Sequence, residues 1–238
     1  MFNREKTMDN IEILKNILLT DDAREEFYDV CRQNANFKYW LAKILPELET
    51  CKMPQNNPWH IYNVLDHILY TVEAINKLSH FLPEKERLTL AMTMFLHDIG
   101  KPQCHLRRMK NGKMIDSFFH HNEASARIAH RVLPQLGFNA VETRKIESLV
   151  LKHDIFMFIE EGKTANPHHE TLSKSLMLRE MAFFEDRGLD GINCMQQLLY
   201  VGEADNLAQN PKMTKGSLHL IHSMQDMLNV LRDESERG

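Results

Sequence analysis

The sequence predicts an all-α protein: one compact helical bundle with an N-terminal helical extension and one short β-hairpin. Apolar residues recur at the helical spacing of i, i+3 and i+4 over most of the chain. Only 9 glycines and 8 prolines interrupt the 238 residues, so few positions break a helix. The strand signal is confined to residues 107–119, where Asn111-Gly112 is a favoured two-residue hairpin turn.

Helical spacing predicts helices at residues 9–19, 22–33, 37–50, 59–79, 84–98, 121–136, 140–153, 171–186 and 190–208. Asp21 or Asp22 can cap the second helix, and Pro83 followed by Glu84 is typical of a helix start. The flanks of the Asn-Gly turn are poorly apolar, so we expect the hairpin to be exposed between helices.

A stretch rich in Pro, Asn and Gln at residues 53–58 marks a soft boundary. We therefore expect an N-terminal extension at 1–55 packed on the main body, a main domain at 56–231 and a disordered, charged tail at 232–238.

The composition is that of a globular protein, with 43% hydrophobic and 26% charged residues and a net charge of −4. This charge argues against a nucleic-acid coat protein but leaves room for a local basic patch. No run is long and apolar enough for a membrane span, and the charged N-terminus lacks an apolar signal region. Scattered cysteines without a CxxC pair indicate reduced thiols in a cytoplasm: Cys31, Cys51, Cys104 and Cys194.

Histidine is abundant, with 13 residues, and the helix predicted at 84–98 ends in His97-Asp98. Nearly every residue from Leu88 to Leu96 is apolar, which indicates a buried helix. Burying a polar group without a partner costs roughly 2–7 kcal/mol. His97 and Asp98 are therefore either paired or metal-bound in the interior, or they form a local pair where the helix emerges into solvent.

Three further polar residues lie on apolar helix stripes: His121, His153 and Asp205. A lone histidine on such a face is more often a hydrogen-bonded core residue than a ligand, but aspartate is rarely buried unless it is paired or metal-bound. His120 lies off the stripe, and so does His67 in its own helix.

Together these residues predict a metal site, because several helices each present a histidine or an aspartate to one interior. Imidazole and carboxylate ligands suit Fe, Mn, Co, Ni or Zn. Asp98, next to His97, can bridge two ions.

The order His67, His97-Asp98, Asp205 resembles the H…HD…D pattern of the HD-domain metal-dependent phosphohydrolases, and HDIGKP at 97–102 is the usual form of the central motif in the HDIG subgroup. The chain resembles in particular the HD region of bacterial CCA-adding tRNA nucleotidyltransferases, over roughly residues 35–210. This resemblance is carried by ILPELE at 44–49, HIYNVLDHIL at 60–69, FFHHNEASARIAHRVLPQLGF at 118–138, VLKHD at 150–154 and EADNLAQ at 203–209.

The sequence departs from that family in two places. The enzymes carry a nucleotidyltransferase head with paired carboxylates on a β-sheet upstream, whereas the roughly 35 residues before the matched region read as helix here. CCA addition is therefore not expected. The family usually has Gly-His-Glu where this chain has His120-His121-Asn122-Glu123.

The resemblance implies one or two divalent ions per chain, of Mn, Fe, Co, Ni, Mg or Zn. It implies that the first is held by His67, His97, Asp98 and Asp205, and the second by His121 and His153 with Asp98 bridging. It also implies catalytic roles for Asp98 and Lys101, with a metal-activated hydroxide attacking phosphorus and Lys101 neutralising a phosphate oxygen. Alternatively, Lys101 interacts with the dipole of the preceding helix.

The implied function is that of a phosphodiesterase or phosphatase acting on nucleotides or RNA ends, for example 2′,3′-cyclic phosphates or 2′-nucleotides. Nucleoside-monophosphate phosphatases and dNTP triphosphohydrolases share the fold and leave the substrate open. The alternatives are a non-catalytic metal-containing sensing or docking module and, from distant relatives, oxygen chemistry at a di-iron site. The expected partner is a phosphorylated small molecule, a nucleotide or an RNA end, and no membrane.

Three accessory features have two readings each. The run from Lys101 to Ile115 carries several cations and no acid, so it either steers phosphates or is a solvated hairpin. His168-His169 either line the mouth of the site or add a ligand, or they lie in a surface loop. Trp59 and Tyr62 either stack on a base or pack in the core.

Overall fold

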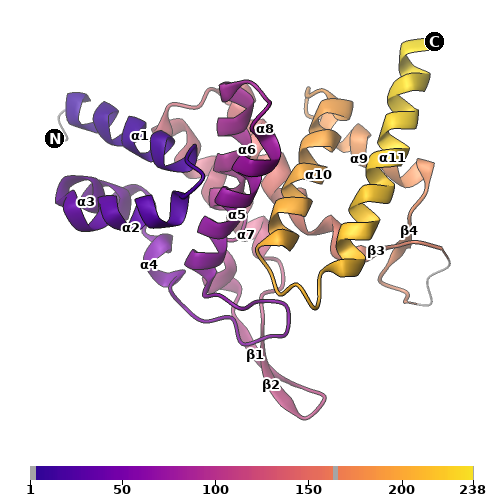
Figure 1. Cartoon of the computed structure of the whole chain (residues 1–238), viewed down its shortest axis with the longest axis horizontal. Coiled ribbons are helices and arrows are strands. Elements are labelled where there is room, and N and C mark those ends of the chain that lie inside the picture. The colour runs from indigo at the N-terminus through magenta and orange to yellow at the C-terminus, as the bar shows by residue number, and fades with distance from the viewer. Residues whose placement is uncertain (1–3, 163–165, 238) are drawn as a thin grey trace.

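The computed structural model describes residues 4–162 and 166–237, which fold almost entirely as helices (Figure 1). The α-helices are α1 (Arg4–Leu18), α2 (Ala23–Gln33), α3 (Ala35–Ile44), α4 (Glu47–Thr50), α5 (Val64–Ser79), α6 (Glu84–Leu96), α7 (His121–Val132), α8 (Ala140–Lys152), α9 (Lys174–Glu185), α10 (Gly191–Leu207) and α11 (Lys215–Arg237). Short 3₁₀ helices follow α6, α7 and α8: η1 (Lys101–Cys104), η2 (Leu133–Leu136) and η3 (His153–Phe158). The predicted all-α fold is confirmed.

Two predicted helices differ from the observed ones because of local backbone chemistry. Pro46 divides the helix predicted at 37–50 into α3 and α4, since a proline disfavours helical dihedrals in the preceding residue and Leu45 has ψ 63°. The helix predicted at 59–79 begins only at Val64. Asn63 caps it, as its Oδ1 accepts a hydrogen bond from Asp66 N at 2.8 Å.

The predicted cap residues have mixed outcomes. Pro83 directly precedes the first residue of α6, as predicted. Asp22 stands at the cap position of α2, but its side chain makes no capping hydrogen bond. The helices predicted to run to residues 136 and 153 end in the tighter turns of η2 and η3.

Helix α11 lies outside the predicted helices, and residues 232–237, which we expected to be disordered, form its last turns. Lys174 and Glu234 form an ion pair there. An apolar stripe stabilises the helix, and the sequence pattern did not reveal it because the stripe runs into the charged end of the chain. Its residues are Leu220, Ile221, Met224, Leu228 and Leu231. Gly238 lies outside the described residues.

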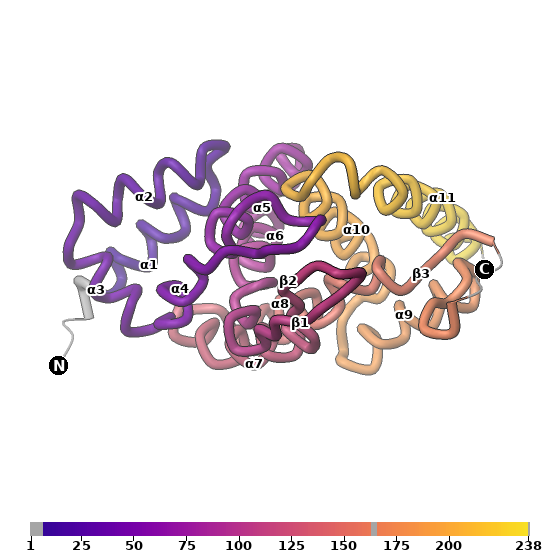
Figure 2. The backbone as a smooth tube through the Cα atoms, turned by 90° about the horizontal axis from the view of Figure 1, so that it is seen from below, coloured from indigo at the N-terminus to yellow at the C-terminus, as the bar shows by residue number. Residues whose placement is uncertain are grey.

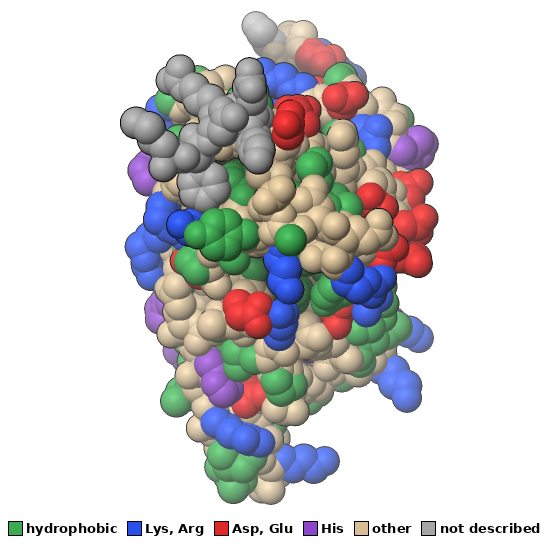
Figure 3. All heavy atoms as spheres, turned by 90° about the vertical axis from the view of Figure 1, so that its left-hand side faces the viewer, with side chains coloured by type: hydrophobic (Ala, Val, Ile, Leu, Met, Phe, Trp, Pro, Cys, Tyr) green, Lys and Arg blue, Asp and Glu red, His purple; other side chains and the backbone are tan. Residues whose placement is uncertain are grey.

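The predicted hairpin is confirmed, and it consists of β1 (Leu106–Lys110) and β2 (Lys113–Ser117) in antiparallel pairing. Asn111 and Gly112 have φ 50° and 73°, as a two-residue turn of this twist requires. The hairpin projects from the body (Figure 1), and basic and hydrophobic side chains lie at the matching lower end of Figure 3. A second, two-residue parallel pairing of β3 (Ile159–Glu160) with β4 (Glu170–Thr171) was not predicted.

The helices form three groups along the long axis, with α1–α4 at one end, α5–α8 in the middle and α9–α11 at the other end (Figures 1 and 2). One hydrophobic core is shared by the first two groups, and a second core joins η3 with α9, α10 and α11. The N-terminal helices therefore pack on the main body. All four cysteines are free thiols.

A polar contact also ties the N-terminal helices to α5. Asp66 Oδ1 accepts from Arg24 Nε at 2.7 Å and from the Tyr28 hydroxyl at 3.1 Å. Because Asp66 directly precedes His67, this contact helps to hold the first turn of α5 in place.

Helix α6 is the buried centre of the bundle, as its sequence predicted. Residues 89–96 are all buried. The helix ends at Leu96 and delivers His97 and Asp98 to the interior, with 0% and 1% exposed surface. Of the helices in the described ranges, none is both long and apolar enough to cross a membrane.

Candidate metal centre

Asp98 lies in the turn after α6, among imidazoles and carboxylates from four other segments of the chain. Gly100 holds this turn against α7, because its backbone N donates to Ser125 Oγ at 2.9 Å. A Cβ on Gly100 would lie only 2.5 Å from Ser125 N and 2.8 Å from His121 O. Glycine is therefore required for the approach of α7, whose first residue is His121.

One oxygen of Asp98 faces a first group of ligand candidates. Oδ2 lies 3.2 Å from His67 Nε2 on α5 and 3.3 Å from His97 Nε2. Asp205, near the end of α10, places Oδ1 3.0 Å from His67 Nε2 and 3.7 Å from His97 Nε2. The structure thus brings together the four residues that the resemblance assigns to the first ion.

The other oxygen of Asp98 faces a second group. Oδ1 lies 3.0 Å from His121 Nε2 and 3.6 Å from His153 Nε2, and the two imidazole nitrogens are 3.2 Å apart. Asp154 completes this group, with Oδ2 3.1 Å from His121 Nε2. The carboxylate of Asp98 is therefore positioned between two clusters of ligand atoms.

All four histidines are oriented in the same way. Each Nδ1 lies within hydrogen-bond distance of a backbone carbonyl oxygen: His67 with Ala208 (3.3 Å), His97 with Met94 (2.6 Å), His121 with Phe118 (2.8 Å) and His153 with Val150 (2.7 Å). A carbonyl oxygen only accepts, so in the neutral imidazole this network assigns the proton to Nδ1 and leaves the lone pair of Nε2 available to a second proton or a metal ion. Such a backbone contact is the usual support for a metal-ligating histidine.

The buried polar atoms of the centre fit a cation. Among the described residues, nine buried side-chain atoms make no hydrogen bond, and five of them belong to the centre: His67 Nε2, His97 Nε2, both oxygens of Asp98, and Asp205 Oδ1. Leaving a buried polar atom unsatisfied costs about 1–3 kcal/mol. All of them are ligand types for divalent transition metals. The clusters His67–His97–Asp205 and His121–His153–Asp154 each keep their ligand atoms within 4.8 Å of one another.

Opposite charges dominate the pKa values of the centre. Burial lowers the pKa of His97, but the nearby Asp98 and Asp205 outweigh burial and raise this pKa to about 9. Burial raises the pKa of Asp98, yet the charges of His97 and Lys101 hold it well below its ordinary value. Protons and a metal ion therefore compete for the same imidazole nitrogens.

Lys101 is the buried cation of the centre, with 4% of its surface exposed. Its Nζ lies 2.5 Å from Asp98 Oδ2 and donates to Gln55 Oε1 at 2.9 Å. It also lies 3.1 Å from His60 Nε2, and His60 Nδ1 contacts Asn57 Oδ1 at 2.9 Å. Since an amide oxygen only accepts, His60 Nε2 is assigned as the acceptor of a Lys101 proton. The ammonium group therefore has two hydrogen-bond acceptors, Gln55 and His60, and an ion pair with Asp98, which together fix its position beside the carboxylate.

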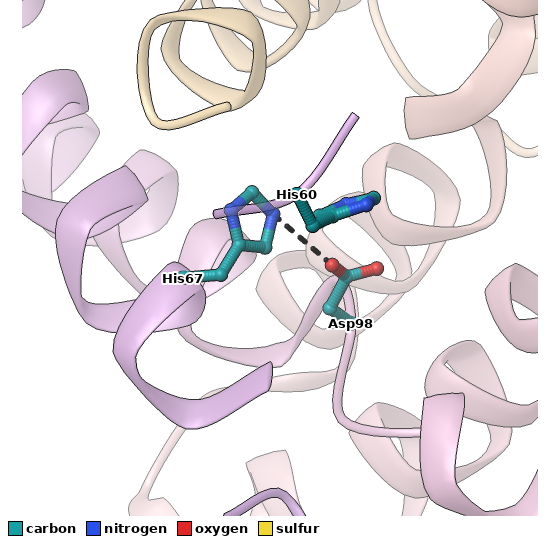
Figure 4. A group of neighbouring side chains, drawn as sticks. All are labelled: His60, His67 and Asp98. Carbon is teal, nitrogen blue, oxygen red and sulfur yellow. Dashed lines mark ion pairs between the residues drawn. The ribbon is translucent and has the colours of Figure 1, made fainter. Parts of the chain in front are cut away.

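His60 is also close to the candidate ligands themselves. Figure 4 shows its ring beside His67 and Asp98, and the three residues form a further group of potential metal ligands. The loop before α5 carries His60, Asn57 and Gln55. Gln55 and His60 of this loop contact Lys101, and Asn57 contacts His60.

The accessory residues lie apart from the centre. His120 precedes α7 with φ 63°, and its exposed side chain contacts Glu123. Glycine adopts this backbone conformation without strain, and glycine is the usual residue at this position in the family that the sequence resembles. His168 is exposed and His169 contacts Glu160 Oε1 at 2.6 Å, and among the described residues neither belongs to a group of potential ligands.

The two aromatic residues before α5 differ in their surroundings. Tyr62 packs on the ring of Tyr70, with 4.3 Å between centroids. Trp59 is 38% exposed and lies below Lys110 of the hairpin. Tyr62 therefore has a packing role in the structure, whereas Trp59 presents part of its ring to solvent.

Asp154 and His60 lie in the centre but were not predicted as site residues. Asp154 falls one residue beyond the helix predicted at 140–153, although the VLKHD motif contains it. His60 precedes His67 by one heptad, so a continuous helix would have placed both on one face. That spacing was the available signal, although a loop brings His60 to the centre.

Comparison with known proteins agrees with this arrangement. Residues 64–208 match the family model described as the HD domain, which spans α5 to the end of α10. The A-adding tRNA nucleotidyltransferase of Deinococcus radiodurans is 28% identical over 113 residues, which are 48% of this chain and 25% of that protein. The bifunctional uridylyltransferase/uridylyl-removing enzyme of Nitrobacter hamburgensis is 30% identical over 115 residues, 42% of this chain and 11% of that protein.

This chain therefore covers a quarter or less of the length of these two relatives. The family model matches a longer stretch of this chain than either relative does. The matched stretch includes all of the predicted metal ligands, namely His67, His97, Asp98, His121, His153 and Asp205. With more than half of its residues matched, the chain belongs to the HD domain family, within the superfamily of metal-dependent phosphohydrolases.

Proposed function

We propose that the protein is a metal-dependent phosphohydrolase that acts on nucleotides or RNA ends. The observation that carries the proposal is the position of Asp98, with one carboxylate oxygen toward His67 and His97 and the other toward His121 and His153. A carboxylate placed between two sets of ligand atoms is suited to bridge two ions.

The ligands of the first ion would be His67, His97, Asp98 and Asp205, and those of the second His121, His153 and Asp98, with Asp154 as an addition of this structure. Divalent ions would lower the pKa of a coordinated water and neutralise charge on a phosphoryl group. Mn, Fe, Co, Ni and Zn suit these ligands, and Mg is a further candidate.

Hydrolysis forms a bond from a water oxygen to phosphorus, breaks the P–O ester bond and returns a proton to the leaving oxygen. We assign Lys101 to the phosphoryl group, because it is a buried cation beside Asp98. A phosphoryl oxygen would replace Gln55 or His60 as one of its acceptors. Fixed donors of this kind stabilise developing negative charge without reorganising during the reaction.

The substrates that we propose are 2′,3′-cyclic phosphates or 2′-nucleotides, free or at an RNA end. The resemblance to the HD region of tRNA nucleotidyltransferases supports an RNA end, and one matched relative carries tRNA in its name. Nucleoside monophosphates and dNTPs belong in the same test, since related enzymes hydrolyse them.

The test is hydrolysis by metal-stripped protein that is resupplied singly with Mn, Fe, Co, Ni, Mg or Zn. The substrates are bis-p-nitrophenyl phosphate, 2′,3′-cyclic AMP, 2′-AMP, 5′-nucleotides and dNTPs. We expect metal-dependent turnover that Asp98→Ala abolishes while the helical circular dichroism is retained. Asp233→Ala, an exposed aspartate on α11, serves as the matched control and should leave turnover unchanged.

Turnover by Asp98→Ala at the wild-type rate would refute the site assignment. Metal bound by the wild-type protein without turnover of any substrate would instead support a sensing or docking module.

A further inference from the structure

The hairpin carries a cationic face that the proposed metal centre does not use. Residues two apart on a strand share a face, as do residues directly opposite on the partner strand. Lys110 pairs with Lys113 across the hairpin, and Arg108 lies two residues before Lys110. These three residues therefore share one face, which we call the cationic face. The hairpin's single acid, Asp116, is buried on the opposite face beside His105.

The cationic face brings like charges close together, which is electrostatically unfavourable without a bound anion. Like charges directly opposite in a two-stranded sheet repel each other, and Lys110 and Lys113 are such a pair. In the described part of the chain, neither lysine has an acidic partner. An anion on this face would remove the repulsion, so the face is suited to bind one.

Exposed aromatic rings accompany these cations. The guanidinium of Arg108 lies 4.8 Å from the ring centre of Phe119, and Lys110 Nζ lies 5.8 Å from that of Trp59. Phe119 is 55% exposed and Trp59 38% exposed. Cations interleaved with exposed aromatic rings are typical of surfaces that bind single-stranded nucleic acid, where phosphates meet the cations and bases stack on the rings.

The two aromatic residues that accompany the cationic face, Trp59 and Phe119, connect it to the metal centre. Trp59 directly precedes His60, which contacts Lys101. Phe119 lies two residues before His121, and the backbone oxygen of Phe118 accepts from His121 Nδ1. The hairpin is also fixed to the loop before α5, because Asn56 N and Nδ2 both donate to Asp116 Oδ2. A strand lying on the face would therefore have its end beside the centre.

We propose that the cationic face of the hairpin, together with Trp59 and Phe119, binds single-stranded RNA and directs its end to the metal centre. The choice of RNA rests on the proposed function, since a 2′-phosphate or a 2′,3′-cyclic phosphate requires a ribose. The preferred substrate is then a phosphorylated end of an oligonucleotide rather than a free nucleotide.

The test is the fluorescence anisotropy of a short fluorescein-labelled single-stranded RNA titrated with the full-length protein in EDTA. The double variant Lys110→Glu, Lys113→Glu should weaken binding at least about tenfold and reduce the slope of log K against log salt by about 1.4, at about 0.7 per lost phosphate contact. The control Lys38→Glu, Lys77→Glu changes the same net charge at exposed lysines of α3 and α5 and should bind like the wild type.

A second variant separates stacking from charge. Trp59→Ala should weaken binding about tenfold with the salt slope unchanged, because stacking involves no counterion release. Equal loss of binding in the control pair would overturn the proposal. So would competition by polyglutamate or polyphosphate as strong as that by RNA, or equal affinity for duplex RNA.

These outcomes are independent of the proposed function, because binding in EDTA needs neither metal nor turnover. Hydrolysis of nucleotides without RNA binding would refute the cationic face alone. RNA binding without hydrolysis of any substrate would refute the proposed function and leave the face as a binding surface.

Discussion

Replacing Lys101 by methionine tests the centre without removing a metal ligand. Methionine keeps most of the buried aliphatic stem but has no charge and no donor. The ammonium group that it removes lies 2.5 Å from Asp98 Oδ2, in a site where the lysine is 4% and the aspartate 1% exposed. The variant therefore leaves Asp98 as a buried anion that has lost its closest cation.

The expected magnitude follows from that burial. Removing one partner of a buried ion pair costs about 3–5 kcal/mol. His67, His97 and His121 also face Asp98, so we expect the lower limit, about 3 kcal/mol, for the metal-free protein. For a chain of this size, that corresponds to a decrease in melting temperature of roughly 6–12 °C. Saturating Mn²⁺ should narrow the difference, because a bound divalent ion compensates the same carboxylate.

The assay compares thermal unfolding with and without Mn²⁺ and then steady-state hydrolysis of the preferred substrate. The variant should bind metal but lose at least about 10²-fold in kcat, as enzymes do when a donor to developing negative charge is removed. Lys85→Met is the control: its Nζ pairs with Glu142 Oε1 at 2.9 Å, but the side chain is 76% exposed, so little stability should be lost.

An unchanged melting temperature together with kcat within threefold of the wild type would refute both the buried pair and the role assigned to Lys101. Lys101→Arg is informative as well, because it keeps the charge but does not fit the contacts of the ammonium group with Asp98, Gln55 and His60.

Variants at Gly100, His121 and Asp116 test three other features of the structure. Gly100→Ala should lower the free energy of unfolding by about 1–3 kcal/mol and weaken binding of the second ion, because the new Cβ would press on the backbone of α7 next to His121. Urea titration measures the first effect and metal analysis the second. If neither quantity changed, the close packing of Gly100 against α7 would be contradicted. His121→Ala should reduce the bound metal from two ions toward one, whereas His120→Ala should not, because His120 lies outside the centre. Elemental analysis measures the metal content, and equal content in the two variants would contradict the second group of ligands. Burial raises the pKa of Asp116, but hydrogen bonds from His105 and Asn56 outweigh burial and lower this pKa. The stability that the carboxylate contributes is therefore complete above its unfolded pKa of about 4, and it is lost as the pH falls through the lower folded pKa. In denaturant titrations from pH 6 to pH 2, Asp116→Asn should therefore be less stable than the wild type near neutrality and converge with it in acid; a constant difference over this range would contradict the assigned pKa.

Sequence patterns alone predict the all-α fold, the hairpin at Asn111-Gly112 and the burial of α6, and the structure confirms all three. These features are local, because helical spacing and turn chemistry act within a few residues. The same periodicity placed His121, His153 and Asp205 on buried faces, and the structure shows them buried. It did not find α11, whose apolar stripe ends in a charged segment.

Helical periodicity could not identify His67 of α5 or the loop residue His60 as members of the centre. It left His67 on the surface, and only the family resemblance identified it as a site residue; in the structure α10 covers it, with Ala208 O at 3.3 Å and Asp205 Oδ1 at 3.0 Å. The contact of His60 with Lys101 likewise depends on a loop whose path no local pattern predicts.

The packing of separate segments sets which oxygen of Asp98 faces which histidines, and it brings Asp154 to the same centre. Periodicity cannot predict these contacts, because it reports only the face of a residue on its own helix. The distance between two ligand atoms depends instead on how separate helices pack, and here that packing depends on long-range contacts such as the approach of α7 to Gly100.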